Sequence, residues 1–218
     1  MSHDLTVLLR GIPVFPDDLG DFDTDAAPEH PADLFTQWLS AAIEAGVAAP
    51  HAMTLSTSGP DGRVSARTLI LKGIDEHGWI FASRDDGPKA RDLGANPFAA
   101  LTFFWPAVGR QVRVSGPVRK QSRADGEADF LARPSGSRAA AFVGHQSEHL
   151  ASLDVYREAY GEASALVEKD PTLVARTWNT WAVAADLVEF WQASADRAHV
   201  RLQYRLHGKT WERGLLWP

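Results

Sequence analysis

The chain has 218 residues, of which 44% are hydrophobic, and its formal net charge is −6. This length predicts one domain, and the composition is that of an ordinary soluble globular protein. The negative charge argues against a general nucleic-acid binder, so an anion site must be a local cluster of cations. Cysteine is absent, which excludes disulfides, thiolate metal sites and cysteine nucleophiles and fits a cytoplasmic protein. No apolar run approaches the ~20 residues that span a bilayer, so we expect no membrane partner.

The N-terminal part of the chain divides into an arm and a helix. Residues 1–30 are rich in proline and aspartate, which predicts an extended arm ahead of a single domain over residues 31–218. A first helix is expected over roughly residues 31–46. Pro31 suits its N-terminal position, Asp33 suits its first turn, and Gly46 suits its end.

The next part of the chain predicts antiparallel strands joined by short loops. Turn signals at residues 59–62 and 75–78 separate strands expected around residues 53–57, 67–72 and 79–81. A short helix starts near Pro88, and strands follow over residues 98–105 and 111–118.

Helices are expected again from about residue 122 to residue 168, with a break at residues 133–137. Ser147 is a fair N-cap candidate for the long last helix of this region. Three strands then follow, over residues 181–188, 197–206 and about 209–216. The middle one alternates cleanly between apolar and polar side chains.

The segment from Arg67 to Lys72 is an apolar run with a cation at each end. Leu69, Ile70 and Leu71 suit a buried strand. Either the end charges reach solvent, or they serve an anionic partner, because a buried unpaired charge is costly. In a regular strand Arg67 and Lys72 point to opposite faces, so one ligand touching both must lie along a strand edge, or the strand must twist or bulge.

Two further segments are candidate anion sites. The helix start near Pro88 offers free N–H groups beside Lys89, which suits a phosphate; the alternative, favoured when the segment is taken alone, is a surface turn with a solvated lysine. Arg197, His199 and Arg201 share the polar face of the strand expected at residues 197–206. They repel one another modestly, so a shared anionic ligand is the alternative to an ordinary solvent-facing surface.

A series of short motifs in order resembles the pyridoxamine 5′-phosphate oxidases, from about residue 34 to the C-terminus. Each motif is weak alone, and their order and spacing carry the resemblance. They are Glu189-Phe190-Trp191-Gln192, Arg197-x-His199-x-Arg201, the final Trp211…Pro218, Arg67…Leu71-Lys72, Asn96-Pro97, Arg110-Gln111-Val112, Arg133-Pro134…Ser137 and Gln146-Ser147.

The resemblance implies an α+β, mainly antiparallel fold. This is the FMN-binding split β-barrel of Greek-key type with flanking helices, in a homodimer with one FMN in each of two clefts between subunits. Arg67 and Lys89 would hold the FMN phosphate with Ser83, and the backbone of residues 68–71 would run along the flavin. Gln146, Ser147, Trp191 and Arg201 would come from the other subunit. The implied FMN-binding set is Arg67, Thr68, Leu69, Ile70, Lys72, Ser83, Lys89, Gln111, Gln146, Ser147, Trp191 and Arg201.

The resemblance also implies a reaction: oxidation of pyridoxamine or pyridoxine 5′-phosphate to pyridoxal 5′-phosphate, with dioxygen as acceptor. Arg197 and His199 would lie against the pyridine ring and the carbon that loses hydride. The substrate phosphate would fall to Lys72, Arg133 and Ser137, together with the position of Asp129. Two alternatives remain. One is a flavin oxidase of the same fold acting on another flat substrate, as in phenazine biosynthesis, and the other is a non-enzymatic flavin-binding module.

The chain departs from the family pattern at several positions. Asp129 stands where the family usually has a tyrosine that helps to bind substrate phosphate, and Pro88 stands where it often has arginine. Ala198 and Val200 replace the usual leucine and aspartate around His199, and the family's arginine and tyrosine of the arm have no match near residues 14–17. At helical spacing i, i+4, Asp129 is expected either to pair with Arg133 and compete with a substrate phosphate, or to point to solvent.

Overall fold

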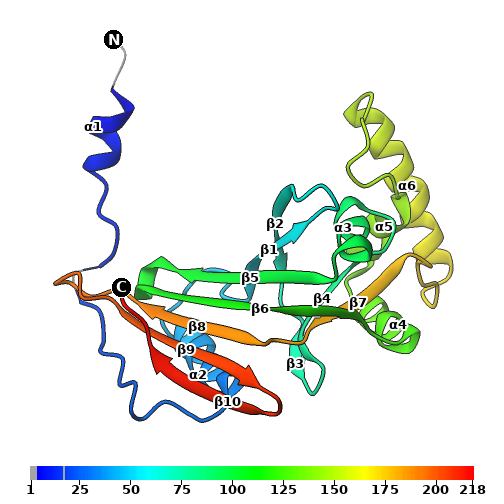
Figure 1. Cartoon of the computed structure of the whole chain (residues 1–218). Coiled ribbons are helices and arrows are strands. Elements are labelled where there is room, and N and C mark those ends of the chain that lie inside the picture. Colours follow the sequence, from blue (N-terminus) through cyan, green and yellow to red (C-terminus); the bar gives the residue numbers. More distant parts are fainter. Residues whose placement is uncertain (1–3, 17) are drawn as a thin grey trace. The chain divides into compact units, whose positions relative to one another are not determined.

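A computed structural model describes residues 4–16 and 18–218 (Figure 1). The helices are α1 (Leu5–Arg10), α2 (Pro31–Glu44), α3 (Pro88–Ala95), α4 (Arg123–Leu131), α5 (Ser135–Val143) and α6 (Leu153–Lys169), with a 3-10 turn at Pro106–Val108. The strands are β1 (Ala52–Ser58), β2 (Val64–Ile70), β3 (Gly73–Asp75), β4 (Gly78–Arg84), β5 (Phe98–Trp105), β6 (Arg110–Lys120), β7 (Trp178–Val183), β8 (Leu187–Gln192), β9 (Val200–His207) and β10 (Thr210–Leu215).

The chain divides into two compact units. The first contains Met1–Met53, Thr102–Val114 and Asp186–Pro218, and the second contains Thr54–Leu101 and Ser115–Ala185. Strands β5 and β6 contribute residues to both units. Mainly antiparallel strands with flanking helices agree with the fold class expected from the sequence.

In the first unit, α2 packs its apolar face against aromatic side chains. The helix begins at Pro31, because proline needs no hydrogen bond at that position, and Asp33 lies in its first turn, as predicted. Phe35 lies 4.7 Å from Phe103, and Trp38 lies 5.2 Å from Phe190, measured between ring centroids. Strands β8, β9 and β10 form an antiparallel meander beside this core, with Phe190 opposite Leu202.

In the second unit, β7 lies between β4 and β6, and β2 is the last strand of the order β5-β1-β2. β2 therefore has a hydrogen-bonded neighbour on one side only, among the strands that the structure describes. Most of its side chains are exposed. Helix α4 begins at a capping box, in which Ser122 accepts from the N–H of Asp125 and the Asp125 carboxylate accepts from the N–H of Ser122. Ala163 and Val167 of α6 pack against Ala139 of α5.

The strand expected over residues 181–188 is wrong, because the chain forms two strands there. Ala184 leaves the ladder, and its N–H donates to the carbonyl of Pro117. Gly116 makes this approach possible, since a Cβ on Gly116 would lie 2.3 Å from the carbonyl oxygen of Ala184. The next strand, β8, then starts a separate ladder with β9 at Leu187.

Three other boundaries differ from the expectation. The long helix begins at Leu153, because Ser152 rather than Ser147 accepts the capping hydrogen bond, and Ser147 has a positive φ of 71°. Strand β9 begins at Val200, so Arg197, whose φ is 66°, lies in the preceding turn rather than on the strand's polar face. In the arm, Asp4 accepts from the N–H of Thr6 and starts the short helix α1, where an extended chain was predicted. Residues 1–3 and 17 of the predicted arm lie outside the described residues.

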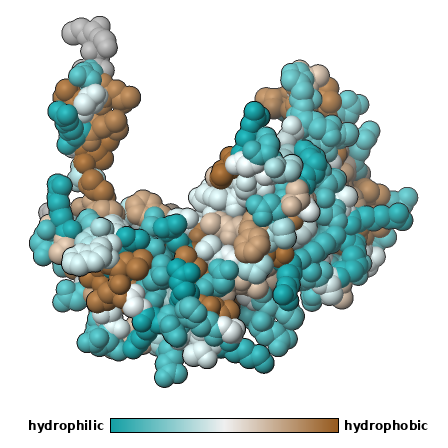
Figure 2. Space-filling view, viewed as in Figure 1, coloured by the Kyte–Doolittle hydropathy of each residue, from teal (hydrophilic) through white to brown (hydrophobic). Residues whose placement is uncertain are grey.

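Helix α1 exposes its apolar side chains. Leu5, Val7, Leu8 and Leu9 are each more than half exposed (Figure 2). No helix among the described residues is both long and apolar enough to cross a membrane.

Candidate functional site

Arg67 of β2 is held in place by three acceptors of the second unit. Its guanidinium donates to Thr57 Oγ1 at 2.7 Å, to Ser65 Oγ at 2.6 Å and to the carbonyl oxygen of Leu55 at 3.3 Å. Asp92 of α3 lies 3.9 Å from the guanidinium. Burial lowers the pKa of Arg67, and Asp92 partly opposes that shift. The guanidinium is therefore fixed before any ligand arrives, which reduces the entropy cost of binding.

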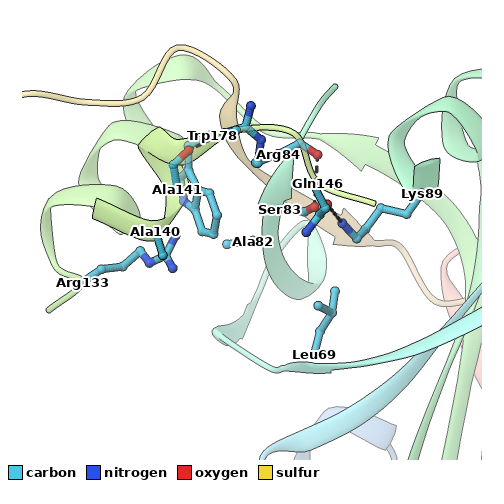
Figure 3. Close-up of a pocket in the computed structure, with 11 residues that line it drawn as sticks. Leu69, Ala82, Ser83, Arg84, Lys89, Arg133, Ala140, Ala141, Gln146 and Trp178 are labelled. Carbon is cyan, nitrogen blue, oxygen red and sulfur yellow. Dashed lines mark hydrogen bonds between the residues drawn. The ribbon is translucent and has the colours of Figure 1, made fainter. Parts of the chain in front are cut away.

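Lys89 lies at the start of α3 and is 7% exposed. Its ammonium group donates to Gln146 Oε1 at 2.7 Å (Figure 3). No carboxylate of the described residues lies within ion-pair distance of it. Burial lowers the pKa of Lys89, and the nearby charges of Arg67 and Arg84 lower it further, with Asp86 opposing. A buried cation without an anion is costly, so this position suits an anionic ligand.

A cavity of about 340 Å³ opens beside Lys89. Leu69, Ser83, Arg84 and Gln146 contribute to its wall. Ser83 and Lys89, which were both predicted to hold a phosphate, line this one cavity. Gln146 reaches this cavity from the same chain, whereas we expected the partner subunit to supply it.

A second cavity, of about 440 Å³, shares part of its wall with the first. The shared residues are Leu69, Ala82, Arg133 and Trp178. The second cavity is otherwise lined by Thr68, Ile70, Lys72, Asp129, Ala132, Pro134 and Ser137. It therefore brings together the four predicted substrate-phosphate residues: Lys72, Asp129, Arg133 and Ser137.

Lys72 reaches this cavity because it is not part of the strand. β2 ends at Ile70, and the N–H of Lys72 donates to the carbonyl of Ile80 instead. The opposite-face argument for Arg67 and Lys72 therefore does not apply. Ile70 is exposed and only Leu71 is buried, so the expectation of a fully buried strand is wrong.

Asp129 has neither of its expected environments. Its carboxylate lies 3.0 Å from Lys72 Nζ and accepts from Trp178 Nε1 at 2.8 Å. The Asp129 side chain is 14% exposed, which excludes the solvent-facing alternative. The expected ion pair with Arg133 does not form, because α4 ends at Leu131 and helical spacing no longer applies at Arg133.

Arg133 stacks on an aromatic ring instead. Its guanidinium carbon lies 3.8 Å from the centroid of the Trp178 ring. Burial lowers the pKa of Arg133, and the charge of Asp129 raises it. The Nη1 atom of Arg133 is buried and has no hydrogen-bond partner in the described structure. An unpaired buried donor that lines a cavity indicates a missing acceptor.

A third cavity, of about 480 Å³, lies within the first unit. Arg197 and His199 line it, together with Ser194 and residues 13–16 of the arm. The ring of His199 lies 4.9 Å from that of Trp191. The N–H of Ser194 donates to His199 Nδ1 at 3.1 Å, so a neutral His199 carries its proton on Nε2.

The other predicted flavin contacts of the first unit are Gln111 and Arg201. Gln111 is half-buried on β6. Arg201 donates to Glu189 Oε1 from Nε at 3.1 Å and from Nη2 at 3.0 Å, and its Nη1 donates to the carbonyl of Trp217. Arg201 is thus already compensated by a carboxylate that is 7% exposed.

Sequence reasoning missed Arg84, Trp178 and Phe15. Arg84 binds Asp86 through both carboxylate oxygens and donates to the carbonyl of Ala141, which ties the end of β4 to α5. Phe15 of the arm packs 5.5 Å from the ring of Trp191. The one available signal is the count of eight tryptophans, which is high and indicates flat ligand surfaces or a large interface without identifying a residue.

The donor set suits FMN. Arg67 and Lys89 lie close enough for the charge of one to lower the pKa of the other, as two cations sharing one phosphate would. The Ser83 hydroxyl and the Gln146 amide add neutral hydrogen-bonding groups at the same cavity.

Comparison with known proteins gives the same result over most of the chain. Residues 39–171 match the family model described as pyridoxamine 5′-phosphate oxidase, and residues 178–218 match the pyridoxine 5′-phosphate oxidase C-terminal dimerisation region. A pyridoxine/pyridoxamine 5′-phosphate oxidase of Rubrobacter xylanophilus is 39% identical over 194 residues, covering 89% of each chain. One of Thermosynechococcus vestitus is 41% identical, covering 90% of this chain and 92% of its own.

Two solved structures support the fold. PhzG from Burkholderia lata, in complex with tetrahydrophenazine-1-carboxylic acid, superposes with a TM-score of 0.86 at 28% identity, covering 92% of this chain and 99% of PhzG. A pyridoxamine 5′-phosphate oxidase-related, FMN-binding protein from Nostoc punctiforme has a TM-score of 0.70 at 16% identity, covering 84% of this chain and 97% of its own. The expected split β-barrel fold is confirmed, and the chain belongs to the pyridoxamine 5′-phosphate oxidase family.

Proposed function

We propose that the protein is an FMN-dependent oxidase that converts pyridoxamine or pyridoxine 5′-phosphate to pyridoxal 5′-phosphate. Dioxygen would be the electron acceptor, and the reaction would take place in the cytoplasm. The observation that carries the proposal is the pair of adjoining cavities, one with the buried Lys89 and one with Lys72, Arg133 and Ser137. Two phosphate groups, one of the cofactor and one of the substrate, would each find cations there. The names of the relatives at about 40% identity support the same reaction.

Arg67, Ser83 and Lys89 would hold the phosphate of FMN, and Gln146 would contact it from the same chain. When bound, FMN supplies the redox chemistry by accepting hydride from the substrate and passing the electrons to dioxygen. The protein binds FMN and the substrate, orients them and polarises the reacting groups. The guanidinium of Arg67 is already fixed by its three acceptors, so it needs no reorganisation.

Arg197 and His199 would position the substrate ring and its exocyclic carbon. No side chain need act as a strong base if hydride leaves directly. His199 presents Nε2–H as a donor in its neutral form, because Nδ1 accepts from Ser194. The pair argues against a purely flavin-binding module, which would not need it.

The proposed ligands of FMN fall into two sets, one in each compact unit. In a homodimer the set around Trp191 and Arg201 would come from the partner subunit, and the C-terminal dimerisation region includes both residues. We expect a yellow dimer. Equilibrium sedimentation of the flavin-loaded protein tests this, and a stable monomer with stoichiometric FMN would contradict a shared site.

A second candidate function is oxidation of another flat substrate, as for PhzG. Two observations favour it: the superposition on PhzG with its bound carboxylic acid, and the carboxylate of Asp129 inside the substrate cavity. Aerobic incubation of the yellow protein with pyridoxamine phosphate decides between the candidates. Peroxide and aldehyde should form together. A folded, flavin-loaded protein that forms neither would rule out the first candidate.

A further inference from the structure

The second cavity carries a smaller net charge than its cations alone would give it. Lys72 and Arg133 are cationic, and Asp129 is a carboxylate 3.0 Å from Lys72 Nζ. Two positive charges and one negative charge leave one positive charge. Ser137 and Trp178, from α5 and β7, add no charge to the wall.

Asp129 is well fixed in this position. Trp178 Nε1 donates to Oδ2 while Lys72 approaches Oδ1, so both carboxylate oxygens have partners. The Asp129 side chain is 14% exposed and that of Lys72 is 26% exposed, so solvent screens the pair only partly. A ligand oxyanion that approached Lys72 would also approach Asp129.

Arg133 keeps at least one donor for a ligand. Its Nη1 is buried and has no hydrogen-bond partner among the described residues, and its guanidinium is fixed on the Trp178 ring. One oriented guanidinium suits an oxyanion with a single negative charge. A dianion would add a charge that Lys72 is not free to neutralise.

We propose that this anion subsite accepts one negative charge: a carboxylate, or a phosphate monoester together with one proton. The proton would reside either on the phosphate or on Asp129, and the two cases are thermodynamically the same for binding. The inference rests on the proposed function for the place where the substrate binds, but not for the identity of the substrate. Asp129 is then the residue that sets the charge of the preferred substrate.

The proposal predicts a pH dependence with a definite sign. A free phosphate monoester loses its second proton near pH 6, at a pKa of about 6. If binding takes that proton up again, affinity falls about tenfold for each pH unit above this value. An aromatic carboxylate already carries one charge, so its affinity should not change between pH 6 and 8.

The groups that face the ligand are Lys72, Asp129, Arg133 and Ser137 around the subsite, with Arg84 and Lys89 in the adjoining cavity. None of them is histidine, whose own titration would fall in the same pH range. The proposed function places His199 against the substrate ring, so the part of the pH dependence that Asp129→Asn removes is the part attributable to the phosphate and its contact with Asp129.

Calorimetry of the flavin-loaded protein tests the proposal. Pyridoxine 5′-phosphate is titrated at pH 6, 7 and 8, each in two buffers of different ionisation enthalpy, which reports proton uptake directly. We expect uptake of about one proton at pH 8 and affinity about fiftyfold weaker than at pH 6, where half of the free phosphate is already monoanionic. Binding of pyridoxine 5′-phosphate at pH 8 without proton uptake would overturn the proposal. Phenazine-1-carboxylate serves as the carboxylate probe.

Asp129→Asn is the decisive variant, because its amide oxygen can still accept from Trp178. It should abolish proton uptake and tighten pyridoxine phosphate at least tenfold at pH 8, with a smaller effect on the carboxylate. Glu127→Gln is the matched control, since it removes an exposed carboxylate of the same helix. Proton uptake that persists in Asp129→Asn would contradict the assignment.

The outcome separates this proposal from the proposed function. If only the carboxylate binds, with no dependence on pH, the single-charge subsite stands and pyridoxine phosphate oxidation falls. If both probes bind with the expected pH profiles but pyridoxine phosphate does not reduce the flavin, the reaction is wrong and the subsite stands. If neither probe binds at any pH, the subsite itself is refuted.

Discussion

Lys72 and Lys89 line adjoining cavities of the same unit, yet a carboxylate balances the charge of Lys72 and none among the described residues balances that of Lys89. Lys72 meets the carboxylate of Asp129 at 3.0 Å. Lys89 is more deeply buried and donates to a neutral amide, while Arg67 and Arg84 add like charge nearby. Lys72 therefore favours singly charged over doubly charged anions, because Asp129 already balances its charge. Lys89 stores unfavourable energy that an anionic ligand can release, so it should contribute most to affinity.

Removing the uncompensated cation should have the largest effect. Lys89→Met should weaken FMN binding about a hundredfold, because a desolvated charge-assisted contact is worth up to ~3 kcal/mol. Quenching of flavin fluorescence measures the affinity. Lys209→Met, which removes an exposed lysine between β9 and β10, is the control and should bind FMN like the wild type. Equal affinities in the two variants would exclude Lys89 from the cofactor site.

The same substitution should stabilise the flavin-free protein, by an amount that depends on pH. The pKa of Lys89 is lowered in the folded state, so below the pKa of the unfolded chain, about 10.4, the unfolded state binds more protons. The stability contributed by Lys89 therefore rises as pH rises towards that value. Melting temperatures from pH 7 to 10 should show the advantage of Lys89→Met shrinking. An advantage that grows with pH would reverse the sign and contradict the interpretation.

Substitution of Arg67 should have the second-largest effect on FMN affinity, because its guanidinium is already paired within the protein and is partly exposed. Arg67→Ala should weaken FMN binding about tenfold, at the lower end of the ~1.5–3 kcal/mol of a charge-assisted contact. Thermal unfolding should show that the fold persists. Arg63→Ala, four residues earlier, is a suitable control, since its side chain is 90% exposed. A folded Arg67→Ala protein with an unchanged flavin dissociation constant would remove Arg67 from the site.

Arg197 tests the first unit, where the expected effect is on turnover rather than on cofactor binding. Arg197→Gly keeps the positive φ of 66° free of strain and removes only the side chain. FMN should stay bound, and the rate of flavin reduction should fall about tenfold, as expected for one lost charged contact of ~1.5 kcal/mol. Stopped-flow spectroscopy measures that rate. Reduction at the wild-type rate with the preferred substrate would refute the positioning role.

The smallest change in ligand affinity is expected where a carboxylate already balances a cation, at Asp129 and Lys72. Asp129→Tyr frees Lys72 from its carboxylate, so pyridoxamine phosphate should bind several-fold more tightly at pH 6, where the phosphate needs the least proton uptake, given that like charges 4 Å apart repel by about 1–4 kcal/mol. FMN binding should not change. Titration of both flavin-loaded proteins with pyridoxamine phosphate measures the difference. Equal or weaker binding in the variant would mean that Asp129 is outside the substrate site, or that the natural substrate is not a pyridoxine phosphate.

Local signals predicted the elements whose ends depend on neighbouring residues. Pro31 and Asp33 placed the start of α2, because proline and an acidic first turn act locally. Ser147 was predicted as an N-cap, but Ser152 caps the helix, since both serines suit a cap and only the course of the chain decides. The break between β7 and β8 was missed for the same reason, as it depends on the distant Gly116.

The candidate site shows the same limit. The resemblance grouped Lys72, Asp129, Arg133 and Ser137, and the structure brings all four to one cavity. It could not give the partner of Asp129, because helical spacing pointed to Arg133, whereas Lys72 comes from a loop 57 positions earlier in the numbering. The tryptophan that fixes both Asp129 and Arg133 lies on β7, further along the chain, and no local pattern links it to them.

The one-sided pairing of β2 has a consequence for making the protein in cells. A strand with a free edge and exposed apolar residues can add to a strand of any other chain, which is a route to aggregation. Val64 and Ile70 are exposed on β2, and the Arg67 guanidinium between them is held by acceptors on β1 and β2 rather than free at the edge. Newly made chains then either fold and assemble or aggregate, and aggregation gains as their concentration rises. We expect slow expression and a generous riboflavin supply to raise the soluble yield, because a bound ligand favours the native form.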